Sequence, residues 1–307
     1  MLLAHWQIGS LYCSSPKFGA NHGCPLSSSL SNKFIAPLSH TKFKYFPKCA
    51  SKCSCVKDAQ TAKPRASEGF LALERDVPWD SGSVWSTMAL YLFSLHIPLS
   101  FGGLSVVSYL LHRPTLDAQT EAMSLLAIQA IELYAVFWLL KCIAKPEYKL
   151  TDFFETKNLS KERSWWLAAV LGFVLLMLLV FFSSFLMDQL NGPKDTNSPI
   201  LKEILSSGLF SRTACILVYC IITPLLEEIV YRGFLLTSLT SRMKWHQAVV
   251  TSSAVFSVAH FSGENLLQLF VIGYVLGCSY CWTGNLRSSF LIHSLYNALI
   301  LVVTFLS

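Results

Sequence analysis

Six polar side chains interrupt three strongly apolar segments in the last hundred residues of the chain. In sequence order they are Glu227, Glu228, Arg232, His260, His293 and Asn297. Carboxylates and imidazoles hold and transfer protons, and amides donate hydrogen bonds. Polar groups of these types inside apolar segments therefore indicate a functional site.

The two acids and the arginine are costly if these segments cross a membrane. A charged side chain at mid-bilayer costs about 2.5–3.5 kcal/mol on insertion scales. Left unpaired, three such residues would cost on the order of 8–10 kcal/mol, which is comparable to the stability of a whole domain. They must therefore face one another or a water-filled cavity.

Helical spacing predicts how these charges pair. Glu228 and Arg232 stand four residues apart on one helix face, so they can form a salt bridge. Glu227 points about 100° away from that face and is left without this partner. Pro224, just ahead of the acids, interrupts the backbone hydrogen bonds and lets the helix bend or admit water.

The other polar residues form stripes of the same kind. Phe256 and His260 stand four residues apart, as do His293 and Asn297. Each stripe has a structural interpretation as an interhelical hydrogen bond, and a helix-pinning salt bridge is the role we assign to Arg232. Polar exceptions on three successive segments nevertheless argue against coincidence and predict one shared site.

The elements that carry these residues are predicted to be membrane-spanning helices. The 307 residues are 53% hydrophobic and 14% charged, with a mean hydropathy of +0.47, whereas soluble domains carry about 25% charged residues. Apolar runs of about 20 residues recur, which is the length that crosses a bilayer. We predict an all-α polytopic bundle of seven to eight helices, with spans at about 84–111, 122–144, 165–187, 209–231, 246–262, 266–283 and 287–306.

Smaller features refine this bundle. A break at Pro98 in the first span would add an eighth span, and a short interfacial helix is predicted around Ile200–Ser206. Gly273 and Gly277 form a GxxxG motif, which lets two helices approach closely. Glu132, a further acid in the second span, is interpreted as an unassigned structural or cavity residue.

Residues 1–57 carry all of the excess positive charge, since the formal net charge of the chain is +6 and this leader holds seven lysines, no arginine and no acid. The rest of the chain is nearly neutral, so nucleic-acid binding loses its support. A Ser-rich, acid-poor leader is typical of an organelle transit peptide, with a plastid favoured over a mitochondrion. The alternative is a disordered cytosolic tail. We therefore predict a transit peptide (1–57), a polar linker (58–83), N-terminal transmembrane helices (84–204) and a C-terminal core (205–307).

The remaining bases and cysteines add two predictions. With seven spans and the mature N-terminus inside, the inner segments carry eleven bases and the outer ones four, which favours an N-inside, C-outside orientation. The five cysteines beyond the leader lie in or beside apolar segments. We interpret them as buried thiols rather than as redox or zinc groups.

The polar motifs resemble those of the CAAX-prenyl protease and bacteriocin-processing family, the type II CAAX endopeptidase or abortive infection family of intramembrane proteases. Its signature is EExxxR on one helix, FxxxH on the next and HxxxN or HxxxD on a later one. Here it stands as Glu227-Glu228-Ile-Val-Tyr-Arg232, Phe256-Ser-Val-Ala-His260 and His293-Ser-Leu-Tyr-Asn297. The resemblance covers about residues 205–305 and implies that residues 205–307 form a protease core.

The resemblance implies peptide-bond hydrolysis inside the membrane. Glu227 would be the general base that polarises a water, and His260 would hold the same water and shuttle its proton. Glu228, tied to Arg232, would orient the site and share the proton load. The substrate would be a membrane protein or a membrane-anchored peptide in the lipid bilayer.

His293 and Asn297 would supply the donors that stabilise the tetrahedral oxyanion, at about 3–4 kcal/mol each in a dry site. Zinc is the alternative cofactor, because the family was long described as metalloproteases and its Glu and His residues can ligate zinc. However, the HExxH arrangement is absent, and His260 and Glu264 have the wrong spacing. We therefore predict a glutamate mechanism without a metal or other cofactor.

Three functions stay open at this point. The first is an active endopeptidase of a plastid membrane, thylakoid or envelope, whose oligomeric state is not predicted. The second is a scaffold or regulator of the same fold that binds a partner without cleaving it. The third is a proton-coupled transporter with a Glu–His relay, which the lack of broken helices repeated in two halves disfavours. Prenylated CAAX proteins become candidate substrates if the leader is not a transit peptide.

Overall fold

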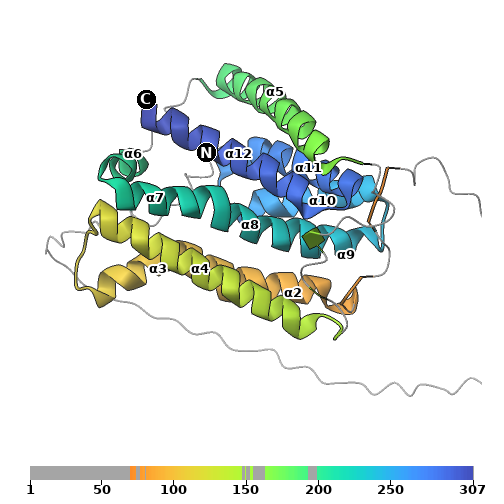
Figure 1. Cartoon of the computed structure of the whole chain (residues 1–307), viewed down its shortest axis with the longest axis horizontal. Coiled ribbons are helices and arrows are strands. Elements are labelled where there is room, and N and C mark those ends of the chain that lie inside the picture. The colour runs from red at the N-terminus through yellow and green to blue at the C-terminus, as the bar shows by residue number, and fades with distance from the viewer. Residues whose placement is uncertain are drawn as a thin grey trace, which may run out of the picture. The chain divides into compact units, whose positions relative to one another are not determined.

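The computed structural model describes residues 70–73, 77–79, 81–146, 149, 153–154, 163–192 and 199–306. The predicted transit peptide, residues 1–57, and most of the predicted linker lie outside the described residues. Every regular element in the described part of the chain is a helix, which confirms the all-α prediction. The helices, many of them labelled in Figure 1, are η3 (Ser81–Ser83), α2 (Val84–Tyr91), η4 (Leu92–His96), α3 (Ile97–Leu110), α4 (Ala118–Ile143), α5 (Trp165–Asn191), α6 (Pro199–Ser206), α7 (Leu209–Leu217), η7 (Val218–Ile222), α8 (Thr223–Glu227), η8 (Glu228–Leu236), α9 (Thr237–Thr240), α10 (Trp245–Ala259), η9 (Gly263–Asn265), α11 (Leu266–Thr283) and α12 (Leu286–Leu306).

Six helical stretches in the described residues are long and apolar enough to cross a bilayer, which confirms the polytopic bundle. They are Val84–Leu110, Ala118–Ile143, Trp165–Gln189, Leu209–Thr240, Gly263–Thr283 and Leu286–Leu306. Pro98 does not break the first stretch, because the π-helical turn η4 directly before α3 accommodates the missing N–H. The predicted interfacial helix is present as α6.

The segment predicted to span at 246–262 is a helix of 15 residues, α10. At 1.5 Å per residue it covers about 22 Å, which is short of the hydrocarbon thickness of about 30 Å. It ends at Ala259, with His260 as its C-cap, and the next residue, Phe261, adopts a left-handed backbone conformation with φ at 49°. The end of α10 therefore presents His260 inside the bundle, where it is buried.

Local sequence signals explain where other helices begin and end. The Asp117 carboxylate accepts the backbone N–H of Thr120 at the start of α4, and these hydrogen bonds lower the pKa of Asp117. Ser164 accepts the N–H of Leu167 at the start of α5. α11 ends at Gly284, whose positive φ of 63° suits a residue without a Cβ.

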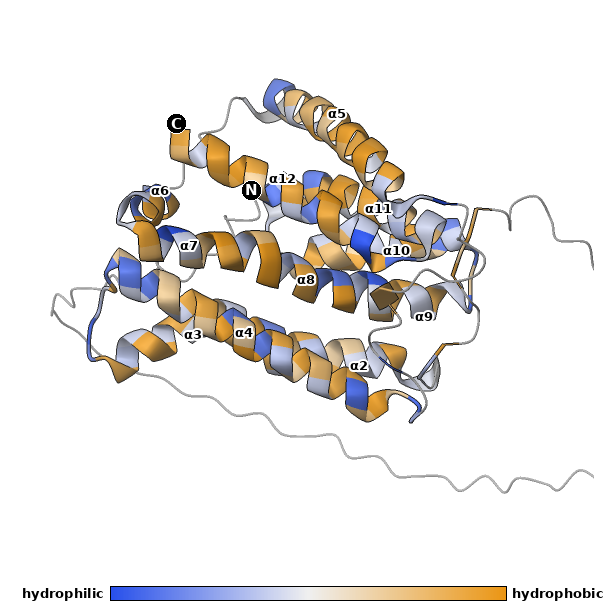
Figure 2. Ribbon diagram, viewed as in Figure 1, coloured by the Kyte–Doolittle hydropathy of each residue, from blue (hydrophilic) through white to orange (hydrophobic). Residues whose placement is uncertain are grey.

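The stretch from α7 to α9 lies at the centre of the bundle. It packs against α4 on one side and against α10 and α12 on the other, and α5 packs on α11 and α12 (Figure 1). α11 and the α7–α9 stretch are the most buried candidate spans, whereas α5 is the least buried. Polar bands interrupt the otherwise apolar helices around α8 and α10 (Figure 2).

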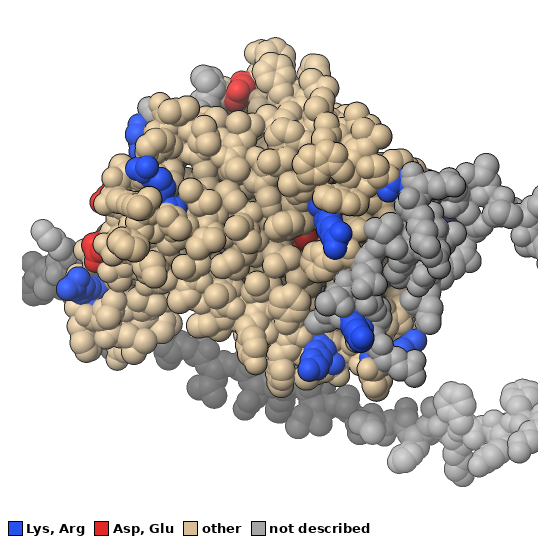
Figure 3. Space-filling view, in the orientation of Figure 1, with Lys and Arg blue, Asp and Glu red and all other residues tan. Residues whose placement is uncertain are grey.

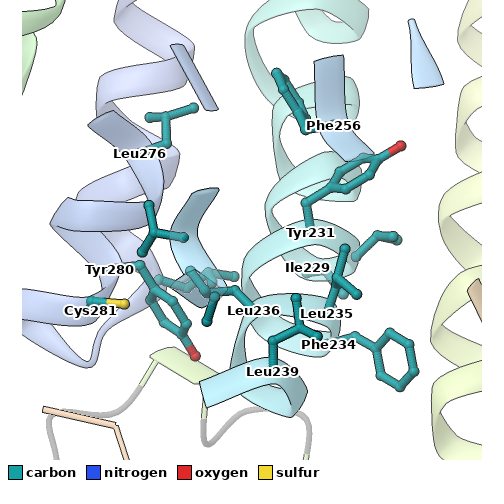
Figure 4. Packing of buried hydrophobic residues seen from close by; sticks show 14 of the residues in the cluster. Ile229, Tyr231, Phe234, Leu235, Leu236, Leu239, Phe256, Leu276, Tyr280 and Cys281 are labelled. Carbon is teal, nitrogen blue, oxygen red and sulfur yellow. The ribbon is translucent and has the colours of Figure 1, made fainter. Parts of the chain in front are cut away.

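The GxxxG motif sets the contact between α10 and α11. A Cβ on Gly273 would lie 3.2 Å from the Cα of Ser253, and one on Gly277 would lie 3.1 Å from Val249. The motif therefore brings two antiparallel backbones together, as predicted. Figure 4 shows the neighbouring core, in which aromatic and aliphatic side chains of η8, α9, α10 and α11 interlock.

Several described residues of the predicted linker pack into the core. Ala72 donates its N–H to the Cys281 carbonyl at 2.8 Å, and the Trp79 indole donates to Ser238 Oγ at 2.6 Å. Arg163 reaches both the Phe70 and the Trp282 carbonyls, at 2.8 Å each. This segment therefore ties the loop before the first span to the ends of α9 and α11.

Charged side chains visible in Figure 3 gather mostly near the two ends of the bundle, and a broad uncharged surface lies between them. The orientation derived from seven spans stays a prediction, because several of the bases it counts lie outside the described residues. All five cysteines in the described part of the chain are free. Cys215 and Cys281 are buried as predicted, Cys220 and Cys278 are half-buried, and Cys142 is exposed on α4.

Candidate functional site

The central stretch carries both acids, and its winding changes around them. Thr223 donates its backbone N–H to the Val218 carbonyl five residues back, which is the π-helical register. The next donor in this register would be residue 224, but Pro224 has no N–H. The buried Tyr219 carbonyl accepts instead from Asn297 Nδ2, at 2.8 Å. Asn297 thus connects α12 to the segment that carries the acids.

Glu228 lies between two positively polarised groups. Its Oε1 is 2.9 Å from Arg232 Nη1, which confirms the salt bridge predicted from the four-residue spacing. The same oxygen is 3.0 Å from Nδ1 of His293. All three side chains are at most 1% exposed. A carboxylate buried this deeply needs such partners, because an unpaired charge would be strongly destabilising.

Arg232 also joins α11 and α10 to the site. Its Nη2 donates to the Gly273 carbonyl at 3.3 Å, and its Cζ lies 4.5 Å from the ring centroid of Phe256. Phe256 in turn packs edge-on against Tyr231, with centroids 5.1 Å apart, and both rings are visible in Figure 4. The structural role predicted for Arg232 is therefore supported by three independent contacts.

Glu227 faces two imidazoles rather than the arginine. Its Oε1 is 3.5 Å from His260 Nε2, and its Oε2 is 3.5 Å from His293 Nε2. Both distances exceed an ordinary hydrogen bond. Glu227 Oε2 and His293 Nε2 have no hydrogen-bond partner among the described residues. Polar atoms of α8, α10 and α12 thus converge on one buried point.

Hydrogen bonds fix how the two imidazoles are oriented. His260 Nδ1 is 2.7 Å from the Phe256 carbonyl, which can only accept, so this nitrogen carries a hydrogen. His293 Nδ1 faces Glu228, and an ionised carboxylate also only accepts. Both rings therefore turn Nε2 toward Glu227. In this arrangement the two Nε2 atoms can exchange protons with a molecule that binds beside the Glu227 carboxylate.

Zinc was the alternative cofactor for these donors. No group of three or more His, Cys, Asp and Glu side chains in the described ranges is arranged to hold a metal ion. The Nδ1 atoms of both imidazoles contact protein groups, His293 with Glu228 and His260 with the Phe256 carbonyl, whereas both Nε2 atoms face Glu227. A mechanism without a metal stays a prediction for this site.

Five of the six polar residues predicted from the sequence contact one another. The sixth, Asn297, donates to the Tyr219 carbonyl on the helical stretch that carries both acids. A second polar cluster was not predicted from the sequence. Glu132 on α4, unassigned there, contacts His96 at the end of η4, and both are buried. A histidine within an apolar span was the available signal, but its partner lies 36 residues away.

Comparisons with known proteins address the same region. The family model described as "Type II CAAX prenyl endopeptidase Rce1-like" matches residues 208–299, the range that holds all six polar residues. This region is therefore similar to the CAAX protease family. A curated relative, the "Membrane-embedded CAAX protease MroQ" of Staphylococcus aureus (strain USA300), is 28% identical over 147 residues.

That match covers 45% of this chain and 58% of the relative, so the chain spans little more than half of the length of this CAAX protease. No solved structure gives a significant match. Helices α2 to α5 precede residue 208 and lie outside the matched family region. The family match therefore gives no information on what those helices contribute.

Proposed function

We propose that this protein is a membrane-embedded endopeptidase that uses Glu227 as its general base. The observation that carries the proposal is the position of Glu227, whose two carboxylate oxygens each lie 3.5 Å from an imidazole Nε2 in a buried, apolar setting. The family match over residues 208–299 supports the reaction class. Because only part of the relative is matched, the activity is a proposal for this chain.

In the proposed reaction, a water donates one hydrogen to Glu227 Oε1 and the other to His260 Nε2. The water oxygen adds to the peptide carbonyl carbon while Glu227 takes its proton. The C–N bond then breaks, and Glu227 returns the proton to the leaving amine. The products are a carboxylic acid and an amine, so no co-reactant is needed.

Stabilisation of the oxyanion is assigned to His293 and Asn297. The buried centre holds two carboxylates, Glu227 and Glu228, but only one guanidinium, Arg232. His293 lies between both acids, and we assign an Nε2–H of its ring as a donor to the reacting carbonyl. One N–H of the Asn297 amide binds the Tyr219 carbonyl, and the second is the donor we assign to the oxyanion.

The scaffold and transporter alternatives make different demands on Glu227. A scaffold needs the shape of the site but no proton transfer, so Glu227→Gln would preserve its function. A proton relay would need the carboxylate yet would cleave nothing. The plastid location and the orientation remain predictions from the leader and the base distribution, and they select which membrane proteins are within reach.

The test compares protein termini in membranes of cells that lack the protein and are rescued with wild type, Glu227→Gln or Glu121→Gln. Glu121 lies on α4, away from the site, so its substitution is a matched control. We expect new termini with wild type and the control but not with Glu227→Gln. Full functional rescue by Glu227→Gln would refute catalysis and favour the scaffold.

Prenyl-protein processing is the second candidate, favoured by the description of the matching family model. It is tested with the purified full-length protein and a quenched fluorescent peptide that ends in a farnesylated CAAX sequence. Its unprenylated counterpart is the control. Cleavage of both peptides alike would show that the prenyl group is not recognised, and cleavage of the farnesylated peptide alone would support CAAX processing.

A further inference from the structure

A second buried polar cluster lies in the N-terminal helices, on the α4 side of the bundle. Glu132 Oε1 is 2.9 Å from His96 Nδ1 and accepts the Tyr91 hydroxyl at 3.2 Å. Glu132 Oε2 accepts Ser100 Oγ at 3.2 Å and Gln129 Nε2 at 3.4 Å. All five side chains are buried, and that of Glu132 is completely inaccessible.

Stability alone does not explain this cluster. A buried ion pair seldom stabilises a protein more than well-packed apolar residues of the same volume would. Here four donors from α2, η4, α3 and α4 converge on one carboxylate within a candidate membrane span. Such buried ionisable groups inside a membrane are functional candidates by default.

The cluster is connected to the helix that carries the general base. Gln129 Oε1 accepts the Thr223 hydroxyl at 3.3 Å. Thr223 and Glu227 stand four residues apart on α8 and therefore share a face. The face of α8 that carries Glu227 is thus turned toward α4 and its polar cluster.

Charge interactions give the same connection. Among the charged groups that act on Glu227, His260 and His293 come before His96, and Tyr91 interacts with Glu227 and Glu132. The titratable groups whose charges interact with Glu227 include His260, His293, His96, Tyr91 and Tyr231. Of these, His96 and Tyr91 belong to the N-terminal helices, outside the matched family region.

We propose that His96 and Glu132 form a proton-sharing pair that contributes to the charge of Glu227, so that the N-terminal helices contribute positioning residues to the site. The pair is neutral as a whole, with its positive end on His96. A positive end near a carboxylate favours the ionised form. The consequence for catalysis rests on the proposed peptidase function, but the coupling of the two groups does not.

The test measures the protonation of Glu227 directly, without turnover. The full-length protein in detergent micelles is treated with dicyclohexylcarbodiimide, an apolar reagent that modifies protonated carboxyls, between pH 5 and pH 9. Labelling of Glu227 is resolved from that of Glu228 and Glu132 by fragment mass spectrometry. The pH of half-maximal labelling is compared among the variants.

We expect that pH to be lowest in wild type and highest in His96→Gln, which removes the positive end and leaves Glu132 without a positively charged partner. The rise is about one pH unit, a tenfold change in proton affinity. The double variant His96→Gln/Glu132→Gln buries no unpaired charge, so its half-labelling pH should lie between the two. A second substitution that partly reverses the first is not expected of independent structural residues.

Glu121→Gln is the matched control, since it is the same substitution on the same helix. It lies eleven residues from Glu132, or about 16 Å along α4, and lines a separate cavity of about 690 Å³ with Arg113 and Glu203. Its labelling curve should coincide with that of wild type.

Coincident curves for wild type and His96→Gln would overturn the proposal. If His96→Gln does not fold, the labelling curve of the double variant is compared with that of wild type instead. Coincident curves for these two proteins would also overturn the proposal. Where turnover is measurable, the acid limb of kcat should move in the same order with KM unchanged. A wild type that labels as expected but cleaves nothing would count against the peptidase and not against the pair.

Discussion

Substitution of Asn297 should separate a structural from a catalytic contribution of the same amide. Its Nδ2 donates to the Tyr219 carbonyl, which lies opposite Pro224 in the π-helical register and finds no backbone donor there. Tyr219 is 7% exposed, so this bond lies in a buried part of the bundle. Asn297→Ala therefore leaves a buried carbonyl unsatisfied, at a cost of about 1–3 kcal/mol in the free energy of unfolding.

Pro224→Ala restores the missing N–H and should repair this defect. In the Pro224→Ala background, the carbonyl has a donor within its own helix, and Asn297→Ala should cost less than about 0.5 kcal/mol. The expected interaction energy of the double-mutant cycle is thus about 1–3 kcal/mol. Unfolding by sodium dodecyl sulfate in mixed micelles, followed by tryptophan fluorescence, measures each corner of the cycle.

Pro98→Ala is the matched control, because Pro98 is also a proline near the start of a helix after a π-helical turn. Its effect and that of Asn297→Ala should add. Additive effects for the Pro224 and Asn297 pair as well would refute the assignment of Asn297 to the orphaned carbonyl.

Measurements of kcat distinguish the proposed oxyanion role of Asn297 from its structural role. As an oxyanion donor, Asn297 should contribute a factor of about 10²–10³ to kcat. Pro224→Ala supplies a backbone N–H but no second donor at the reacting carbonyl. We therefore expect Asn297→Ala/Pro224→Ala to regain stability and to stay slow. Recovery of both together would mean that Asn297 acts only through the fold.

Three further outcomes follow from the contacts described above. Arg232→Met leaves the buried Glu228 carboxylate without its guanidinium and should lower the free energy of unfolding by about 3–5 kcal/mol; a loss below 1 kcal/mol would contradict the pairing. Gly273→Ala forces a Cβ to 3.2 Å from the Ser253 Cα and should cost about 1–3 kcal/mol in the same assay, whereas Gly102→Ala meets no atom within 4 Å and should not destabilise. Because the donors are not arranged as a metal ligand set, turnover should withstand 1,10-phenanthroline, and loss of activity that added Zn²⁺ restores would refute the metal-free mechanism.

The six polar residues could be identified from sequence because charge inside an apolar span is costly and must be compensated. Their spacing also predicted the Glu228–Arg232 bridge, which depends on neighbouring turns of one helix. The contact of Glu228 with His293 joins residues 65 positions apart, and local spacing carries no information on it. The pairing of His96 with Glu132 was missed for the same reason.

The end of α10 was equally inaccessible to pattern analysis. The apolar run continues through Phe261, so the sequence predicts a span to residue 262. The helix instead ends at Ala259, with His260 as its C-cap, and Phe261 takes a positive φ that such a side chain seldom adopts. Strained conformations of this kind concentrate at functional sites. Here the consequence is that the imidazole of His260 stands at a helix end, directed at Glu227.

The two ring nitrogens of His293 explain how consecutive acids can contact one histidine. In a regular α-helix, neighbours diverge by about 100°, and this angle led us to predict that Glu227 lies apart from the Glu228–Arg232 pair. Glu227 and Glu228 have ordinary α-helical dihedral angles, with φ of −65° and −64°. His293 meets Glu228 through Nδ1 at 3.0 Å and Glu227 through Nε2 at 3.5 Å. The imidazole therefore spans the angle between the two carboxylates and joins both acids to α12.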